Sequence, residues 1–453
     1  MTTSVTGTLS RGWDRIKATQ LRTRAASRPL RPETFACRFP RRRSRRCAGG
    51  VPWRRVYAVV SRTRSGRQDG PVKLAIVGGV LLVLGAVAVF TGVLPASDAI
   101  GIGERVWPIL LFVVAITIVA ELAAVAGLFD VIGAFLARVS RGRTWALWAL
   151  VVVLAVVSTA FLSLDTTAVL LTPVVIALAR AHRLSPLPFA FATVWLANTA
   201  SLVLPVSNLT NLLAVHRLGM TSPGAFLTLL GPSAFVAIVV TVLLLWASHR
   251  RELRGRFAPA VPPAVADRTL LVATSVVVVI LLPLLVTGIP PWMPAVGAAV
   301  VLGAIFLWRA PGAVRPALVP WQLVVFAAGL FLVVGAFEAL GSAGALAVLA
   351  GRGDDLIALW RVAASGLIGS NAINNLPAYL ALETVADSPR RMAALLVGVN
   401  AGPLITPWAS LATLLWHQRL AGVGVDVPWR RYVLLGLVAA PLTVALAVVP
   451  LAL

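Results

Sequence analysis

Apolar runs recur from residue 72 to the end of this chain, and most are close to the ~20 residues that a helix needs to cross a bilayer. Arg, Trp, Gly and Pro bound these runs. The chain is 59% hydrophobic and only 12% charged, whereas about a quarter of the residues of a soluble domain are charged. We therefore predict an all-α polytopic membrane protein, in preference to a soluble bundle of buried helices.

The Lys/Arg bias of the loops predicts a topology. Cytoplasmic loops carry an excess of Lys and Arg. The loops of this chain follow that rule if the N-terminus lies inside and if two of the apolar runs each enter and leave the membrane on the same side. The chain then makes nine full crossings plus two re-entrant hairpins, or thirteen crossings if both hairpins span. We expect a multi-pass protein of the inner (plasma) membrane with a cytoplasmic N-terminus. The runs are 72–95, 106–137, 145–181 (hairpin), 187–216, 225–247, 269–287, 292–308, 320–350, 356–385 (hairpin), 391–416 and 432–452.

The first 71 residues differ in composition from the rest of the chain. Residues 1–73 hold 19 of the 40 Lys and Arg residues and three acids. We predict that 1–71 is a basic disordered tail, or upstream sequence added by a wrongly chosen start codon. Binding of this tail to anionic lipid is the alternative that we weigh, and we expect no nucleic acid among the partners.

Residues that hold cofactors are scarce. The only cysteines, Cys37 and Cys47, lie in the basic tail, and the four histidines show no zinc or haem spacing. The chain has no Walker A loop for ATP. We therefore expect no cofactor and no metal site, and an energy source that is an ion gradient or a separate ATPase subunit.

Two segments of the chain resemble each other at an offset of 202 residues. Residues 198–213 (NTASLVLPVSNLTNLL) align without a gap on 400–415 (NAGPLITPWASLATLL), so that Asn198 matches Asn400. Pro205 and Pro407 match in the same alignment. Leucine matches mean little in an apolar chain, but these polar and proline matches predict two helices that are broken at equivalent places.

The repeat extends upstream in the same order. At an offset of 204, SLDTTAVLLTP (163–173) corresponds to GSNAINNLP (369–377), and at an offset of 217 a Glu-x4-Ala-Gly pattern at Glu121 recurs at Glu338. The halves 106–216 and 320–416 each contain a long helix with Glu, a polar hairpin and a broken helix, and the topology makes them inverted. Inverted repeats with broken helices are typical of secondary transporters, so we predict that 72–453 is a transporter domain.

The polar breaks supply the candidate binding residues. Unwound backbone at membrane depth persists only inside protein or beside water, and its free N–H and C=O groups can bind a small solute or ion. Asp165 is the sharpest candidate, because a carboxylate inside a membrane is functional by default and can carry a proton, coordinate a cation or bind substrate. The candidates are Ser163, Asp165, Thr166, Thr167, Asn198, Thr199, Ser201, Ser207 and Asn208 in the first half, and Ser370, Asn371, Asn374, Asn375, Asn400 and Thr406 in the second.

Three further acids lie within apolar runs. Glu121 and Glu338 are candidate coupling acids, with a structural role as the equal alternative. Glu383 is expected near the mouth of the second hairpin, where a solvated helix end is the alternative.

These motifs resemble the ArsB arsenite permeases of the ion transporter superfamily, which also holds the divalent-anion/sodium symporters and NhaD-type antiporters. The resemblance covers about 72–453 and rests on VWPILLFVVAITIVAELAAVAGLFD (106–130), FLSLDTTAVLLTPVV (161–175), NTASLVLPVSNLTNLL (198–213) and NNLPAYLAL (374–382). It implies two hairpins and two broken helices around the substrate, and efflux of arsenite or antimonite in exchange for protons, in some members with an ATPase partner.

The resemblance also implies roles for individual residues. Ser163, Asp165, Thr166 and Thr167 fall on its first hairpin motif, and Asn371, Asn374 and Asn375 fall on its second. The symporter branch carries Ser-Asn-Thr at both hairpin tips, whereas this chain reads Ser163-Leu-Asp-Thr and Ser370-Asn-Ala. This departure speaks against Na⁺/dicarboxylate symport.

The sequence leaves three hypotheses for the function. The first is proton-coupled efflux of arsenite or antimonite, because the breaks contain no Lys or Arg and suit a neutral trihydroxide bound by hydroxyls and amides. The alternative is a Na⁺/H⁺ antiporter or an anion permease for dicarboxylate, sulfate or citrate. A membrane enzyme or scaffold is the third hypothesis, and no nucleophile–base pair supports it. The partners that we consider are the lipid bilayer, a small inorganic solute with H⁺ or Na⁺, a second copy in a homodimer, and an ATPase subunit.

Overall fold

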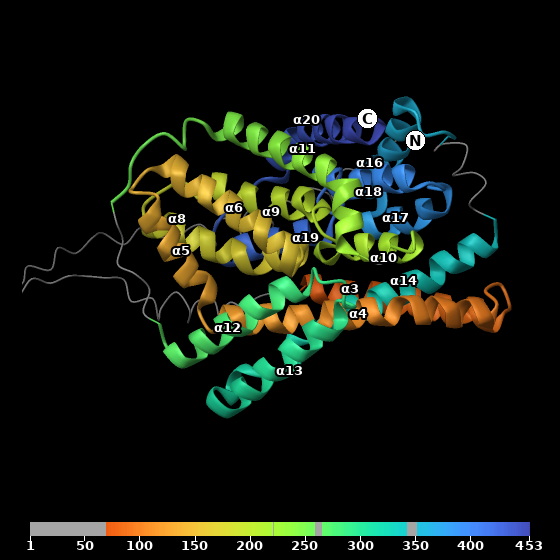
Figure 1. The fold of residues 1–453 in the computed structure, drawn as a ribbon, viewed down its shortest axis with the longest axis horizontal. Coiled ribbons are helices and arrows are strands. Elements are labelled where there is room, and N and C mark those ends of the chain that lie inside the picture. Colours follow the sequence, from red (N-terminus) through yellow and green to blue (C-terminus); the bar gives the residue numbers. More distant parts are fainter. Residues whose placement is uncertain (1–68, 221, 259–264, 342–350) are drawn as a thin grey trace, which may run out of the picture. The chain divides into compact units, whose positions relative to one another are not determined.

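In the computed structural model, every regular element of the described residues is a helix (Figure 1). The structure describes residues 69–220, 222–258, 265–341 and 351–453, all of which belong to one unit, Val51–Leu453. Within these ranges the β-type pairing is an isolated bridge between Arg143 and Arg256. The predicted all-α fold is confirmed, and the predicted tail 1–71 lies almost wholly outside the described residues.

The first predicted repeat folds as a long helix, a hairpin and a broken helix. The long run predicted over 106–137 is divided, because Gly127 takes a left-handed φ of 82° that ends the first helix and starts a second. The elements are α4 (Ala96–Val125), α5 (Leu128–Val139), α6 (Thr144–Leu162), α7 (Leu164–Thr166), the π-helix η2 (Thr167–Leu171), α8 (Thr172–Ala181), α9 (Leu187–Thr199), the 3-10 helices η3 (Ala200–Leu202) and η4 (Pro205–Ser207), and α10 (Leu209–Arg217).

The second predicted repeat has the same order of elements, and further helices precede, connect and follow the two repeats. Those of the second repeat are α14 (Trp321–Ala339), α16 (Leu356–Ile373), α17 (Asn375–Leu382), η7 (Glu383–Val385), α18 (Pro389–Ala401) and α19 (Leu411–Gly422). The others are α3 (Asp69–Phe90), α11 (Pro223–His249), α12 (Arg268–Leu284), α13 (Trp292–Arg309), η5 (Pro311–Ala313), η6 (Pro316–Leu318), α20 (Trp429–Val448) and η8 (Val449–Ala452).

Eight helical segments of the described residues are long and apolar enough to cross a membrane, and three shorter apolar helices accompany them. Two of the eight, Thr144–Leu162 and Leu164–Ala181, are the arms of the first hairpin, which enters and leaves at one end. At the start of α6 the N–H of Thr144 donates to the Gly255 carbonyl at 3.2 Å, and just after α8 the ring Nδ1 of His182 lies 2.9 Å from the Ala258 carbonyl. Both ends of the hairpin therefore contact the same short segment.

The second hairpin is closed at its base by a buried arginine. Arg391 is 2% exposed, and its guanidinium donates to the carbonyls of Gly353 (3.0 Å) and Gly351 (2.8 Å), which precede α16. It also donates to the carbonyl of Val385 at 3.0 Å, at the end of η7. Arg391 thus joins the entry and the exit of this hairpin.

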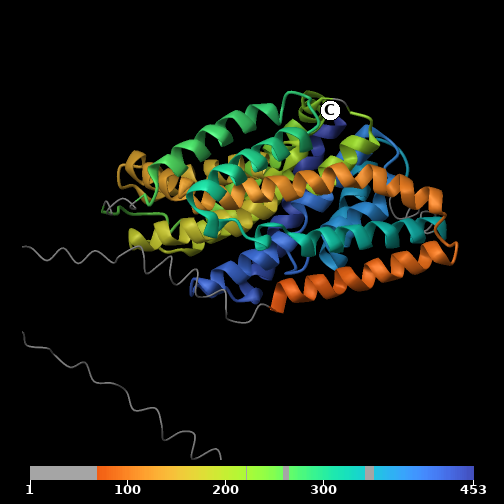
Figure 2. The ribbon, with the colours of Figure 1, turned by 90° about the horizontal axis from the view of Figure 1, so that it is seen from below.

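The two halves are inverted. The long helices α4 and α14 run antiparallel in both views (Figures 1 and 2). In Figure 1 the first hairpin (α6 to α8) lies at the left and the second (α16 and α17) at the right. The predicted inverted arrangement is confirmed by these directions.

The hairpin tips share an uncommon backbone conformation. Ser163 has φ 91° and ψ 159°, and Asn374 has φ 115° and ψ 154°, a region that residues other than Gly rarely adopt. The tips therefore match at an offset of 211, and the predicted offset of 204 is wrong. The difference of seven residues is about two helical turns, so the sequence alignment kept the helical face but missed the residue at which the chain turns.

Of the alignments at offsets of 202 and 217, the structure tests only the first in full. The offset of 202 is confirmed, since α9 ends at Thr199 and α18 at Ala401, while α10 begins at Leu209 and α19 at Leu411. For the Glu-x4-Ala-Gly pattern, the residues predicted to match Ala126 and Gly127 lie outside the described residues. The left-handed glycine after α14 is Gly341, with φ 85°.

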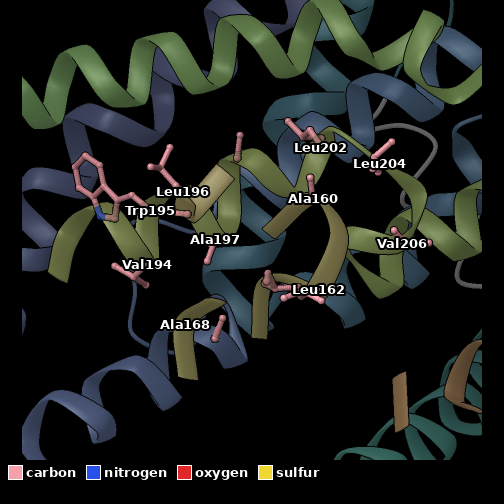
Figure 3. Packing of buried hydrophobic residues seen from close by; sticks show 14 of the residues in the cluster. Ala160, Leu162, Ala168, Val194, Trp195, Leu196, Ala197, Leu202, Leu204 and Val206 are labelled. Atoms are coloured by element: carbon pink, nitrogen blue, oxygen red, sulfur yellow. The ribbon is translucent and has the colours of Figure 1, made fainter. Parts of the chain in front are cut away.

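Buried apolar side chains surround the first hairpin tip and the first helix break (Figure 3). Unwound backbone at membrane depth needs this protein cover. Those labelled in Figure 3 are Ala160, Leu162, Ala168, Val194, Trp195, Leu196, Ala197, Leu202, Leu204 and Val206.

Gly398 allows α16 and α18 to approach closely. A Cβ at this position would lie 2.2 Å from the Ala363 carbonyl oxygen, and small residues permit such contacts between membrane helices. We expect Gly398→Ala to lower the free energy of unfolding by about 1–3 kcal/mol, measured as thermal unfolding in detergent. Gly297→Ala on α13, where a Cβ meets nothing within 4 Å, is the control, and equal melting of the two variants would contradict close packing at Gly398.

Candidate functional site

A cavity of about 60 Å³ lies where both hairpin tips and both helix breaks meet. Because the hairpins enter at opposite ends but their tips line the same cavity, both hairpins are re-entrant and neither crosses the membrane. The lining residues are Leu110, Phe112, Val113 and Thr117 of α4; Ser163, Leu164 and Asp165; Val206, Asn208, Leu209 and Leu212; Leu323, Val324 and Phe326 of α14; Asn374, Asn375 and Leu376; and Ser410 and Leu411.

Four segments begin at this cavity, and the residue at each start lines it. These N-terminal residues are Ser163, Asn208, Asn374 and Ser410. The first turn of a helix has N–H groups without helical partners and carries a partial positive charge. The cavity therefore favours a ligand that presents oxygen atoms.

Asp165 is the single acid among the lining residues. It is partly buried, and no hydrogen bond or ion pair to its carboxylate is formed within the described part of the chain. The lining contains no Lys, Arg or His. A carboxylate with low solvation and no partner is stable only if it takes up a proton or a ligand, so Asp165 is suited to bind one or the other.

Asn374 and Asn375 join the second hairpin tip to the second helix break. The Nδ2 of Asn374 donates to the Trp408 carbonyl at 2.8 Å, and the N–H of Asn375 donates to the Ala409 carbonyl at 2.9 Å. The Oδ1 of Asn375 accepts from the N–H of Leu376 at 2.9 Å. These amides satisfy unwound backbone and line the cavity at the same time.

Asn371 and Thr406 bond to each other and do not line the cavity. The Oδ1 of Asn371 accepts from the N–H groups of Ile405 (3.2 Å) and Thr406 (3.0 Å), and its Nδ2 donates to the Gly402 carbonyl at 2.9 Å. The Thr406 hydroxyl donates to the Asn371 carbonyl at 2.8 Å. Asn371 thus replaces the helical partners that the broken backbone has lost, which is a structural role.

Asn400 joins the two halves of the molecule. Its Oδ1 accepts from Asn208 Nδ2 at 2.8 Å and from Thr210 Oγ1 at 2.9 Å, and its Nδ2 donates to Asn211 Oδ1 at 2.7 Å. Asn400 is fully buried. It therefore holds the start of α10, and with it the cavity-lining Asn208, against α18.

Asn198, the repeat equivalent of Asn400, makes no such bridge. Its Nδ2 donates to the Val194 carbonyl of its own helix at 2.9 Å. Its Oδ1 is buried and has no partner among the described residues. The two halves of the site are therefore unequal.

The remaining predicted residues lie behind the cavity rather than along it. Thr167 Oγ1 donates to Ser158 Oγ at 2.9 Å, and the Ser370 hydroxyl donates to the Leu367 carbonyl at 3.0 Å. Glu121 and Glu338 lie on α4 and α14 and are not lining residues. The other residues of this group are Thr166, Thr199, Ser201 and Ser207, which are buried and hydrogen-bonded locally.

Ser410 lines the cavity but is absent from the candidates drawn from the sequence. It is fully buried, and its Oγ has no partner among the described residues. The offset of 202 relates it to Asn208, so the repeat itself carried the signal. Serine and asparagine do not match by identity, which is why the alignment did not select it.

Comparison with known proteins establishes the family. A family model described as a citrate transporter (CitMHS) matches residues 70–413. The chain belongs to this family. An arsenical pump membrane protein of Escherichia coli is 30% identical to the chain, and the match covers 78% of the chain and 88% of the relative. The arsenical pump membrane protein of Yersinia enterocolitica is 29% identical, and that match covers 79% of the chain and 88% of the relative. The predicted relationship to ArsB-type permeases is confirmed.

A solved structure supports the fold of this citrate-transporter-family member. The crystal structure of the Alcanivorax borkumensis YdaH transporter, reported to have an unusual topology, covers 85% of this chain and 98% of its own. It aligns with a TM-score of 0.55 at 17% sequence identity. The structural match supports the fold, and the family model together with the arsenical pump relatives shows that the chain is a multi-pass membrane transporter.

Proposed function

We propose that this transporter exports arsenite or antimonite in exchange for protons, with Asp165 as the group that carries the proton. The observation that carries the proposal is the cavity itself, in which one carboxylate without a protein partner lies among amides, hydroxyls and helix N-termini. The arsenical pump proteins that resemble the chain support this substrate class.

The lining suits a small neutral solute. Arsenite and antimonite are neutral trihydroxides near pH 7, so they need hydrogen-bond donors and acceptors rather than fixed positive charge. Ser163, Asn208, Asn374, Asn375 and Ser410 supply both kinds of group. Deprotonated Asp165 can accept a charge-assisted hydrogen bond from a substrate hydroxyl. Protonation removes the charge and turns one of the two oxygens into a donor, which weakens that contact and couples binding to pH.

An anion permease is the second candidate. The four helix starts at the cavity provide partial positive charge, and the family model that matches is described as a citrate transporter. A multiply charged anion would nevertheless meet Asp165 and no Lys, Arg or His among the lining residues. The lining therefore favours the neutral solute.

Flux in proteoliposomes tests the proposal. Purified protein is reconstituted and offered arsenite, sulfate, citrate or Na⁺ under an imposed pH gradient. We expect arsenite to move with the gradient and the two anions to stay at the level of protein-free vesicles. Citrate or sulfate flux without arsenite flux would establish the anion permease, and pH-linked Na⁺ flux alone would establish an antiporter.

The topology and assembly remain part of the proposal. The Lys/Arg bias supports a cytoplasmic N-terminus for a protein of the inner (plasma) membrane. We propose that the protein acts as a secondary transporter. A homodimer and an ATPase subunit remain predictions, and size measurement in detergent and co-purification test them.

Ser410 is expected to contribute to substrate binding. Its hydroxyl has no partner among the described residues, so Ser410→Ala removes no protein hydrogen bond and keeps the fold. Loss of one neutral hydrogen bond to substrate, about 1 kcal/mol, raises the KM for arsenite about fivefold. The matched control is Ser370→Ala, also fully buried but bonded to its own helix, and an unchanged KM in Ser410→Ala would exclude this contact.

A further inference from the structure

An ion pair between a partly buried arginine and a buried glutamate lies at the end of the cavity at which the second hairpin enters. Arg105 Nη1 and Nη2 lie 2.8 and 2.7 Å from Glu383 Oε1 and Oε2. The Glu383 carboxylate is 5% exposed, whereas those of the pairs at Asp267 and Asp387 are 30% and 72% exposed. Glu383 therefore does not form the solvated helix end considered as an alternative.

This ion pair joins two walls of the cavity. Arg105 is five residues before Leu110 on α4, about 7.5 Å along the helix axis, and Leu110 lines the cavity. Glu383 is seven residues after Leu376, about two turns from the second hairpin tip, and Leu376 also lines the cavity. The pair thus connects α4 to the second hairpin just beyond the substrate space.

Further charged groups stand near the pair on other elements. Glu338 on α14 interacts electrostatically with Arg105, with Glu383 and with Arg217, which ends α10. Tyr379 of the same hairpin lies close enough to interact with Glu383. Arg105 therefore has a second carboxylate nearby on a helix outside the hairpin.

We propose that Arg105 and Glu383 form a gate that closes the cavity at this end. Opening the gate separates α4 from the second hairpin, and Arg105 then pairs with Glu338, so its charge is not left alone in a poorly solvated place. The proposal requires only that the chain is a transporter, and it holds for any substrate.

Labelling of a cysteine inside the cavity tests the gate without any substrate. Leu110→Cys is introduced into a chain whose two natural cysteines, Cys37 and Cys47, are replaced by Ala. A membrane-impermeant maleimide is applied to vesicles from each side in turn. In this parent we expect slow labelling from the side at which the second hairpin enters.

Weakening the ion pair is expected to speed that labelling. Glu383→Gln should raise the rate about tenfold, the population shift that follows a loss of about 1.4 kcal/mol of closed-state preference. Arg105→Lys keeps the charge but loses the two-point contact, so it should raise the labelling rate by less than Glu383→Gln does. It also tests the gate if Glu383→Gln fails to fold. The double exchange Arg105→Glu with Glu383→Arg should return the rate toward the parent.

Two controls separate a gate from a purely structural contact. Asp267→Asn removes an exposed carboxylate–arginine pair elsewhere and should leave the labelling unchanged. Glu338→Gln removes the second carboxylate and should lower the labelling rate, since the open state loses a partner for Arg105. Parent-like rates in folded Arg105→Lys and in folded Glu383→Gln overturn the gate, whatever the flux measurements show about arsenite.

Discussion

Asp165→Asn is expected to reduce pH-driven arsenite flux to the level of protein-free vesicles. Asparagine has nearly the same shape as aspartate but carries no titratable proton. No protein hydrogen bond to the Asp165 carboxylate is lost within the described part of the chain, so the variant should fold and express as the wild type does. Flux in proteoliposomes and arsenite resistance in a sensitive host measure the effect.

The control for Asp165→Asn is a second acid within an apolar run. Glu121→Gln removes a carboxylate on α4 that does not line the cavity, and we expect it to retain pH-driven flux. Asp165→Glu, which keeps the titratable group but moves it by one methylene, should retain part of the flux. Full pH-driven flux in Asp165→Asn would place the coupling group elsewhere.

Asn400→Ala is expected to have the largest effect on stability. It leaves Asn208 Nδ2, Thr210 Oγ1 and Asn211 Oδ1 without their partner, and each buried unsatisfied group costs about 1–3 kcal/mol. We therefore expect the free energy of unfolding to fall by about 3 kcal/mol or more. Thermal unfolding in detergent, followed by gel filtration, measures the change.

Asn198→Ala is the matched control, because the repeat places Asn198 where Asn400 lies in the other half. The variant loses one hydrogen bond to its own helix, but it also removes a buried oxygen that has no partner. The free energy of unfolding should therefore fall by less than about 1 kcal/mol. Comparable losses in both variants would show that the bridge across the halves contributes nothing beyond local helix bonding.

Much of the fold could be predicted from patterns that act along one segment. The long apolar runs require helices, and Asn-to-Pro spacing at an offset of 202 located both helix breaks. Prediction failed where two conformations share the same local pattern. The offsets of 204 and 211 differ by about two helical turns, so the same face is presented in both, and only the left-handed φ of Ser163 and Asn374 shows where the hairpins turn.

For the site too, the sequence predicted some features and the tertiary structure supplied the others. Polar residue type alone selected Asn371 and Asn374 together, but Asn371 bonds to the broken backbone around Thr406, whereas Asn374 lines the cavity. Ser410 escaped selection because it does not match Asn208 by identity, and its lack of a hydrogen-bond partner depends on its neighbours in the fold. Whether a side chain contacts substrate or bridges two segments depends on which residues, distant in the sequence, pack against it in the fold.

The sequence by itself determined that the chain is helical, crosses a membrane several times, contains a broken-helix repeat and keeps a carboxylate at Asp165. These properties follow from the free-energy cost of placing unpaired backbone or charge in hydrocarbon. This cost applies to each segment separately, so it can be read from the local sequence. Only the tertiary structure decided that both hairpins are re-entrant, that Asn400 joins the halves and that Arg105 meets Glu383. Those contacts connect residues roughly 190 to 280 positions apart, and no local pattern encodes such pairings because they depend on how the inverted halves pack together.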